Sequence, residues 1–192
     1  MFEERLKDPV AKALFQELTA QQENISIGKK ATFLDLLNSK LIIVPDNLNF
    51  YYLKLLQAIL SPSMSVEQKK YVKYSIADSQ KSFTQEVYQA SDIDLQSQTQ
   101  PQQPILFAIG QKFMFQQFVV LLGGSKFLFN TYLEAIEFCF QVISIFKFKY
   151  IKKCENIWLF LQNFCFEAAL KSKNSKVETF ISDVNNLIET IS

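Results

Sequence analysis

Few residues of this chain could do chemistry, because its 192 residues include no histidine. Histidine is the commonest general acid or base in enzymes. One motif with a chemical reading is Gly123-Gly-Ser-Lys126. A phosphate-binding loop needs the pattern GxxxxGK[ST] between a strand and a helix, whereas this lysine follows the serine. We therefore interpret the motif as a glycine turn between two helices.

Glu134 and Glu137 lie three residues apart, which places both carboxylates on one face of a predicted helix. Paired carboxylates serve acid–base catalysis when burial separates their pKa values. Helical two-metal sites also use such glutamates, but together with histidine. A solvated helix face is the interpretation we favour, since glutamate is almost never buried unpaired.

The three cysteines, Cys139, Cys154 and Cys165, show no metal-binding spacing. Cys154 follows two lysines, so it is the one thiol with a plausible means of activation. Cys154 and Cys165 would stand about 16 Å apart along one helix, too far for a disulfide. We predict buried, reduced thiols in an intracellular compartment, which is the cytoplasm, cytoskeleton or cilium, with the mitochondrion as the alternative. We also predict no cofactor, no metal, no catalytic residue and no enzyme activity.

A basic patch follows, in which the lysines alternate with Phe148 and Tyr150. Its members are Lys147, Lys149, Lys152 and Lys153. Such a pattern can contact phosphates and stack bases. The net charge of +1 lacks the basic footprint of a nucleic-acid-binding domain, so we predict no nucleic-acid partner. A helix C-terminus, an anionic membrane surface and an acidic protein patch are the other interpretations.

The aromatic residues carry the main functional hypothesis. Thirteen of the 19 phenylalanines fall between Phe107 and Phe166, and such a segment must be covered by the chain, a partner or lipid. Many stand two residues apart, and in a helix such neighbours point about 200° apart. Some must therefore face a partner. We predict partner-facing rings at Phe115, Phe129, Phe140, Phe148 and Trp158. We predict internal rings at Phe113, Phe118, Phe138 and Phe164.

Helix signals dominate the pattern, so the predicted fold is all-α, an antiparallel helical bundle or a short stack of helical hairpins, with about six to eight helices. A stripe from Leu6 to Leu18 opens the chain. Pairs that resemble capping boxes begin at Thr32, Ser65 and Ser175. Further helices are predicted at residues 33–39, 48–60, 66–89, 105–122, 127–149, 155–170 and 177–191.

Composition divides the chain into an amphipathic half (1–90), a Gln/Ser/Pro-rich linker or loop (91–104) and a Phe-rich half (105–192), unless both halves form one domain. Residues 105–122 are the most apolar stretch, but Lys112 and several glutamines interrupt it. We predict no transmembrane span there, while membrane contact stays open.

Together these patterns favour a non-catalytic helical subunit or scaffold of a larger assembly, in a ciliary, cytoskeletal or organelle complex, with other protein subunits as partners. The alternative is a helical protein that binds an apolar ligand or a lipid in a phenylalanine-lined cavity.

Overall fold

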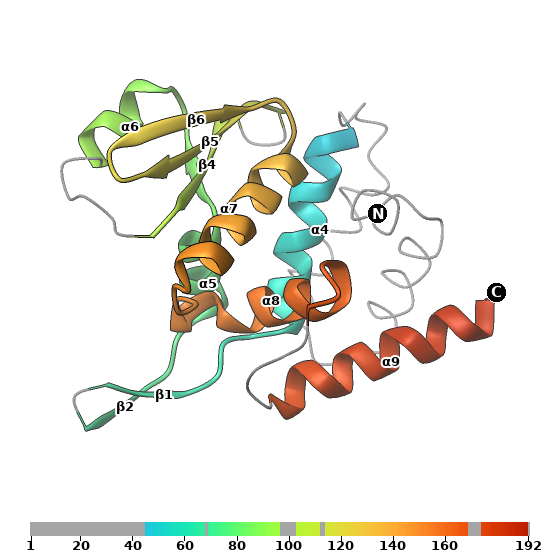
Figure 1. Cartoon of the computed structure of the whole chain (residues 1–192). Helices are drawn as coiled ribbons and strands as arrows, with labels where there is room; N and C mark the ends of the chain where they lie inside the picture. The colour runs from blue at the N-terminus through green and yellow to red at the C-terminus, as the bar shows by residue number, and fades with distance from the viewer. Residues whose placement is uncertain (1–44, 68, 97–102, 112–113, 169–173, 192) are drawn as a thin grey trace.

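The computed structural model describes residues 45–67, 69–96, 103–111, 114–168 and 174–191. These residues form a four-stranded mixed sheet, a separate two-stranded ribbon and six α-helices (Figure 1). The chain therefore has an α/β fold, and the prediction of an all-α bundle is wrong. The stripe from Leu6 to Leu18, the Thr32 pair and the helix at 33–39 lie outside the described residues.

The described elements follow one another along the chain as a mixture of short strands and helices. In order they are α4 (Pro45–Ile59), β1 (Ser65–Glu67), β2 (Lys70–Val72), α5 (Ile76–Phe83), β3 (Gln85–Val87), α6 (Ser91–Gln96), β4 (Ile105–Gln111), β5 (Met114–Leu122), β6 (Ser125–Phe129), α7 (Tyr132–Phe146), the 3-10 turn η1 (Lys152–Cys154), α8 (Glu155–Phe160), the π-helical turn η2 (Leu161–Cys165) and α9 (Ser175–Ile191).

The main sheet has the strand order β3-β4-β5-β6. β4, β5 and β6 form an antiparallel meander, whereas β3 pairs parallel to β4 through a crossover that contains α6. β1 and β2 pair with each other and with no strand of the main sheet. Figure 1 shows this ribbon projecting from the body of the molecule. No described helix is long and apolar enough to cross a membrane.

Residues 105–111 and 114–122 form the antiparallel strands β4 and β5 and not the predicted helix. Most of the stretch is apolar because both faces of the sheet are covered. Leu106 and Phe118 face α7 in the larger core, while Phe107 packs in a second cluster on the opposite face. A strand buried on both faces reads as a continuous apolar run, and periodicity alone cannot distinguish such a run from a buried helix.

The long amphipathic helix predicted at 66–89 is also wrong, because this stretch contains β1, β2, α5 and β3. Ser65 lies in β1 and does not cap a helix. The helix begins ten residues later, where Ser75 Oγ accepts a hydrogen bond from the Asp78 backbone N–H at 3.0 Å. Asp78 Oδ2 in turn accepts from the Ser75 N–H at 2.9 Å, which completes a capping box.

Aromatic rings from α4, β5 and α7 meet at the centre of the larger core. The Tyr132 ring lies 5.2 Å from the ring of Phe50 and 5.2 Å from that of Phe118, centroid to centroid. The Tyr132 hydroxyl is hydrogen-bonded to Thr84 Oγ1 at 2.7 Å, and both residues are buried. Residues before and after the predicted linker therefore contribute to one core.

Ile93 anchors the first part of that predicted linker. It lies in α6, is fully buried, and packs with Phe107 and Leu121 on the sheet face opposite α7. Residues 91–96 are thus a short helix that covers the sheet, while residues 97–102 lie outside the described part of the chain. The division into two halves stays a prediction.

The predicted helices at 48–60 and 177–191 are confirmed as α4 and α9. α9 is capped by Asn174, whose Oδ1 accepts from the Val177 N–H at 3.3 Å, one residue before the predicted Ser175. Asn156 links α8 to the end of α4 and to the start of α9. Its Nδ2 donates to the carbonyl of Ser61, just after α4, at 2.8 Å. Its Oδ1 accepts from Nδ2 of Asn174, just before α9, at 3.0 Å. The helices predicted at 127–149 and 155–170 are shorter than predicted. The first is α7, which begins only after β6, and the second is α8, which continues into the π-helical turn η2.

Gly110 permits a bulge in the β4–β5 hairpin. Ile109 pairs with Gln117 and Gly110 pairs with Phe115, so that Gln116 is the extra residue. The bulge returns the Phe115 side chain to the face that carries Phe118. Gly110 has a φ of +143°, and a Cβ atom there would lie 2.5 Å from the Met114 carbonyl oxygen.

We expect Gly110→Ala to lower the free energy of unfolding by about 3 kcal/mol or more, because it adds a backbone clash to an unfavourable φ. Gly124→Ala is the matched control, since Gly124 also has a positive φ of +81° but no atom within 4 Å of an added Cβ. That control should cost only about 1–2 kcal/mol. Urea unfolding of both variants measures the difference, and equal costs would contradict the close backbone approach.

Candidate functional site

Gly123 and Gly124 form a turn, but it joins the strands β5 and β6 and not two helices. Both have positive φ values, +56° and +81°, as two-residue hairpin turns require. A phosphate loop needs a helix N-terminus directly after the glycines. Here Ser125 begins a strand that pairs with Leu122, so the motif is a hairpin turn.

The two glutamates of α7 have separate roles. Glu134 forms a capping box with Thr131, in which the Thr131 Oγ1 accepts from the Glu134 N–H at 3.2 Å and Glu134 Oε2 accepts from the Thr131 N–H at 3.1 Å. Glu137 is exposed and accepts a hydrogen bond from Gln141 Nε2 at 3.4 Å. Neither carboxylate is placed for acid–base chemistry.

All three cysteines are buried free thiols. Burial raises the pKa of Cys154 from 9.0 to about 12, although a hydrogen bond with Trp158 opposes this. Burial also raises the pKa of Cys139. A nucleophilic cysteine needs the thiolate form and an accessible, electropositive site. Among the described residues, no group of three or more cysteine or acidic side chains is placed to hold a metal ion.

A serine and a lysine missed at the sequence level lie close together between α4 and α9. Lys176 Nζ donates to Ser61 Oγ at 2.6 Å and to the Ser61 carbonyl at 3.1 Å, beside a groove of about 320 Å³. Burial lowers the pKa of Lys176. A lysine that acts as a base must be neutral, but an amine that donates to two oxygens just beyond a helix C-terminus is a charged capping group. The contact between Lys176 and Ser61 therefore has a structural role, since it holds the start of α9 against the end of α4.

The prediction of opposed faces for phenylalanines two residues apart assumes that both lie in one helix. This assumption is wrong for Phe115, for Phe127 with Phe129, and for Phe146 with Phe148, because α7 ends at Phe146. Along a strand, residues two apart share a face. Phe127 and Phe129 in β6 both contact Phe138, at 4.9 and 5.2 Å between ring centroids. Phe115 likewise lies in a strand, β5, while Phe113 lies outside the described residues. In α7 the geometry holds, because Phe140 turns away from Phe138 and stacks on Phe166 at 3.9 Å.

Two residues predicted to face a partner are buried inside this chain. Phe115 and Trp158 are each 6% exposed. Phe115 packs 4.5 Å from Phe50, and Trp158 packs 4.8 Å from Phe83, between ring centroids. Phe129, Phe140 and Phe148 are half-buried, as are Phe138 and Phe164 of the internal set, whereas Phe118 is 2% exposed.

Three apolar side chains are nevertheless exposed where α7 ends, and together with the half-buried Phe148 we call them the α7-end surface. Its members are Ile145, Phe146, Phe148 and Ile151. Ile145 is 73% exposed and Phe146 62% exposed. The rings of Phe146 and Phe148 stack at 5.7 Å across Lys147, whose positive φ of +54° ends the helix. The sequence did not single out Ile145 or Ile151.

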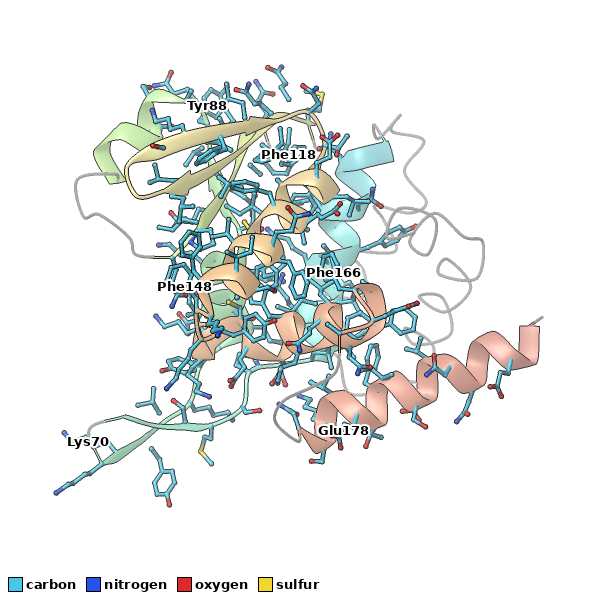
Figure 2. The ribbon with its side chains drawn as sticks, in the orientation of Figure 1. Lys70, Tyr88, Phe118, Phe148, Phe166 and Glu178 are labelled. Carbon is cyan, nitrogen blue, oxygen red and sulfur yellow. The ribbon has the colours of Figure 1, made fainter. Side chains whose placement is uncertain are left out.

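The four lysines of the predicted basic patch border the α7-end surface, and all are exposed. Lys152 forms an ion pair with Glu155 at 2.8 Å, and Lys153 lies 5.7 Å from the Tyr74 ring centroid. Lys147 and Lys149 form no ion pair with any described residue. Figure 2 shows Phe148 on the flank of the body from which the β1–β2 ribbon extends to Lys70.

An aromatic-lined cavity lies behind this surface, between Tyr150, Trp158 and Cys139. Its volume of about 10 Å³ leaves room for one water molecule and not for a lipid chain. Burial raises the pKa of Tyr150 to about 12, and its hydroxyl donates to Gln162 Oε1 at 2.8 Å. This cavity could not serve the predicted alternative of a lipid carrier.

Comparison with family models, curated proteins and solved structures finds no match for this chain. Its function is therefore argued from its own residues.

We expect none of the three thiols to react with an alkylating reagent at about pH 8 in the folded chain, because burial disfavours the thiolate. After unfolding in urea all three should react. For Cys154 the folded pKa lies above the ordinary 9.0, so its contribution to stability is present below pH 9 and is lost as the pH rises towards about 12. Labelling of Cys154 in the folded chain, read by mass spectrometry, would contradict its burial.

Proposed function

We propose that this chain is a non-catalytic subunit or scaffold of a larger protein assembly, and that it docks other protein subunits through the α7-end surface. The observation that carries the proposal is the adjacent exposure of Ile145 and Phe146 at the end of a helix. An exposed apolar cluster with a polar rim is typical of an interaction site.

The composition of this surface supports a protein partner. Interfaces combine an apolar centre with a polar, solvent-accessible rim, and here Ile145 and Phe146 adjoin Lys147 and Lys149. Burial of each large apolar side chain contributes roughly 1.5–3 kcal/mol. Two such anchors could supply much of the binding free energy, as hot-spot residues do.

The side chains that could have been reactive have structural roles or are buried, and this supports a non-catalytic role. Glu134 caps a helix, Lys176 holds α9, and Cys154 is buried. The buried free thiols also support an intracellular, reducing location. Within that location we propose a ciliary, cytoskeletal or organelle complex, with the mitochondrion as the alternative compartment.

The double variant Ile145→Ser/Phe146→Ser should leave the free energy of unfolding within about 0.5 kcal/mol of wild type, because both side chains are largely exposed. It should weaken assembly by about tenfold or more, because both apolar anchors are lost. Crosslinking with mass spectrometry in native extract, followed by co-purification of the crosslinked subunits, measures this loss.

The matched control is Met114→Ser/Leu128→Ser, which removes two apolar side chains that are 55% and 65% exposed on β5 and β6. This control should keep the wild-type partners. If both double variants recover the same subunits in the same yield as wild type, the α7-end surface is not the docking site.

A further inference from the structure

Two segments of this chain carry an excess of positive charge. Residues 65–81 and 147–155 hold eight lysines and three carboxylates, a net charge of +5 in a chain whose total is +1. The rest of the chain is therefore net negative. The segments adjoin in the fold, because Lys153 Nζ lies 5.7 Å from the Tyr74 ring centroid and α5 contacts η1.

Local interactions engage two of those carboxylates. Asp78 is held in the capping box with Ser75, whose hydrogen bonds lower the pKa of its carboxyl group. Glu155 pairs with Lys152. The lysines at positions 70, 73, 147 and 149 have no such partner among the described residues, and all four are exposed.

The β1–β2 ribbon, here called the arm, adds apolar surface to this charge. Tyr71 is 80% exposed, and Met64 at its base is 65% exposed. Figure 2 shows Lys70 near the tip of the arm, away from the body that carries Phe148. The described residues include nine exposed large apolar side chains, and five of them lie in or beside the two lysine-rich segments: Met64, Tyr71, Ile145, Phe146 and Ile151.

We propose that the arm and the α7-end surface together dock one acidic, amphipathic segment of a partner protein. The proposal rests on the proposed function and names the chemistry of the partner. Carboxylates of that segment would meet Lys70, Lys73, Lys147 and Lys149. Its apolar side chains would cover Tyr71, Ile145 and Phe146. Complementary charge of this kind guides association and selects the partner.

The shape and the residue types favour a protein segment over the two other anionic partners. The arm projects from the body (Figure 1), so a flat bilayer that touched its tip would not lie along the α7-end surface. Single-stranded nucleic acid needs aromatic faces for base stacking. Of the five exposed apolar side chains at this surface, Met64, Ile145 and Ile151 are not aromatic, and Phe146 stacks on Phe148. Tyr71 is the one remaining ring of the five, so the surface offers no row of rings for successive bases.

The test uses the full chain and a fluorescein-labelled synthetic peptide of glutamate, leucine and phenylalanine, with fluorescence anisotropy as the readout. A second peptide has glutamine at every glutamate position. We expect the glutamate peptide to bind more tightly, and its affinity to fall as salt is added. Phosphatidylserine vesicles and an oligo-dT strand are the competing probes, and tighter binding of either would overturn the proposal.

Three single variants locate the site, each of which removes one exposed lysine. Lys70→Gln on the arm and Lys149→Gln beside the α7-end surface should each weaken binding of the glutamate peptide by about threefold, as expected for one exposed charge pair. Lys126→Gln on β6 is the control and should leave binding unchanged. Equal effects of all three variants would show that only net charge matters, and would overturn the proposed site.

The outcomes separate this inference from the proposed function. If the two peptides bind equally well and Ile145→Ser/Phe146→Ser weakens both, apolar docking stands and the acidic partner is ruled out. If neither peptide binds, the acidic partner is also ruled out, while co-purification of the assembly still decides the proposed function.

Discussion

The hydrogen bond between Thr84 and Tyr132 lies at the point on which the rest of the fold depends. It joins the end of α5 to the first residue of α7, and the surrounding rings of Phe50 and Phe118 bring α4 and β5 to the same place. Both hydroxyl groups are buried, and loss of this hydrogen bond inside the core would be costly. This contact fixes the start of α7 against the sheet. The direction of α7 then determines where its last turn, with Ile145 and Phe146, leaves the core.

The sequence contained reliable signals for parts of this fold. The helical pattern of α4 and α9 is plain, and Gly123-Gly124 is a hairpin signal. Ser75 with Asp78, and Thr131 with Glu134, are cap pairs that mark the true starts of α5 and α7. These pairs compete with similar pairs elsewhere, such as Ser65 with Gln68. Only the tertiary contacts decide which of them begin a helix.

Other parts could not be read from local pattern. Residues 105–122 are apolar because helices cover both faces of the hairpin, and nothing within the segment records that second layer. Because these strands were predicted as helices, their phenylalanines two residues apart were assigned to opposite faces. Side chains repeat every 3.6 residues around a helix but every 2 residues along a strand, so such phenylalanines share a face. The basic patch was found because lysine is evident from sequence alone. The exposure of Ile145 and Phe146 could not be predicted from the sequence, because it depends on where α7 ends.

The parallel pairing of β3 with β4 has a consequence for the order of folding. Only two residues separate β4 from β5, and only two separate β5 from β6, so each pairing closes only a small loop. β3 pairs with β4 across the α6 crossover, with Gln85 opposite Phe107, and that loop is longer and entropically more costly to close. We therefore expect the meander to form early and β3 to join it late. The arm and α5, which precede β3 in the chain, would then reach their places only after the aromatic half has begun to collapse, so the lysine-rich surface would be among the last features to mature.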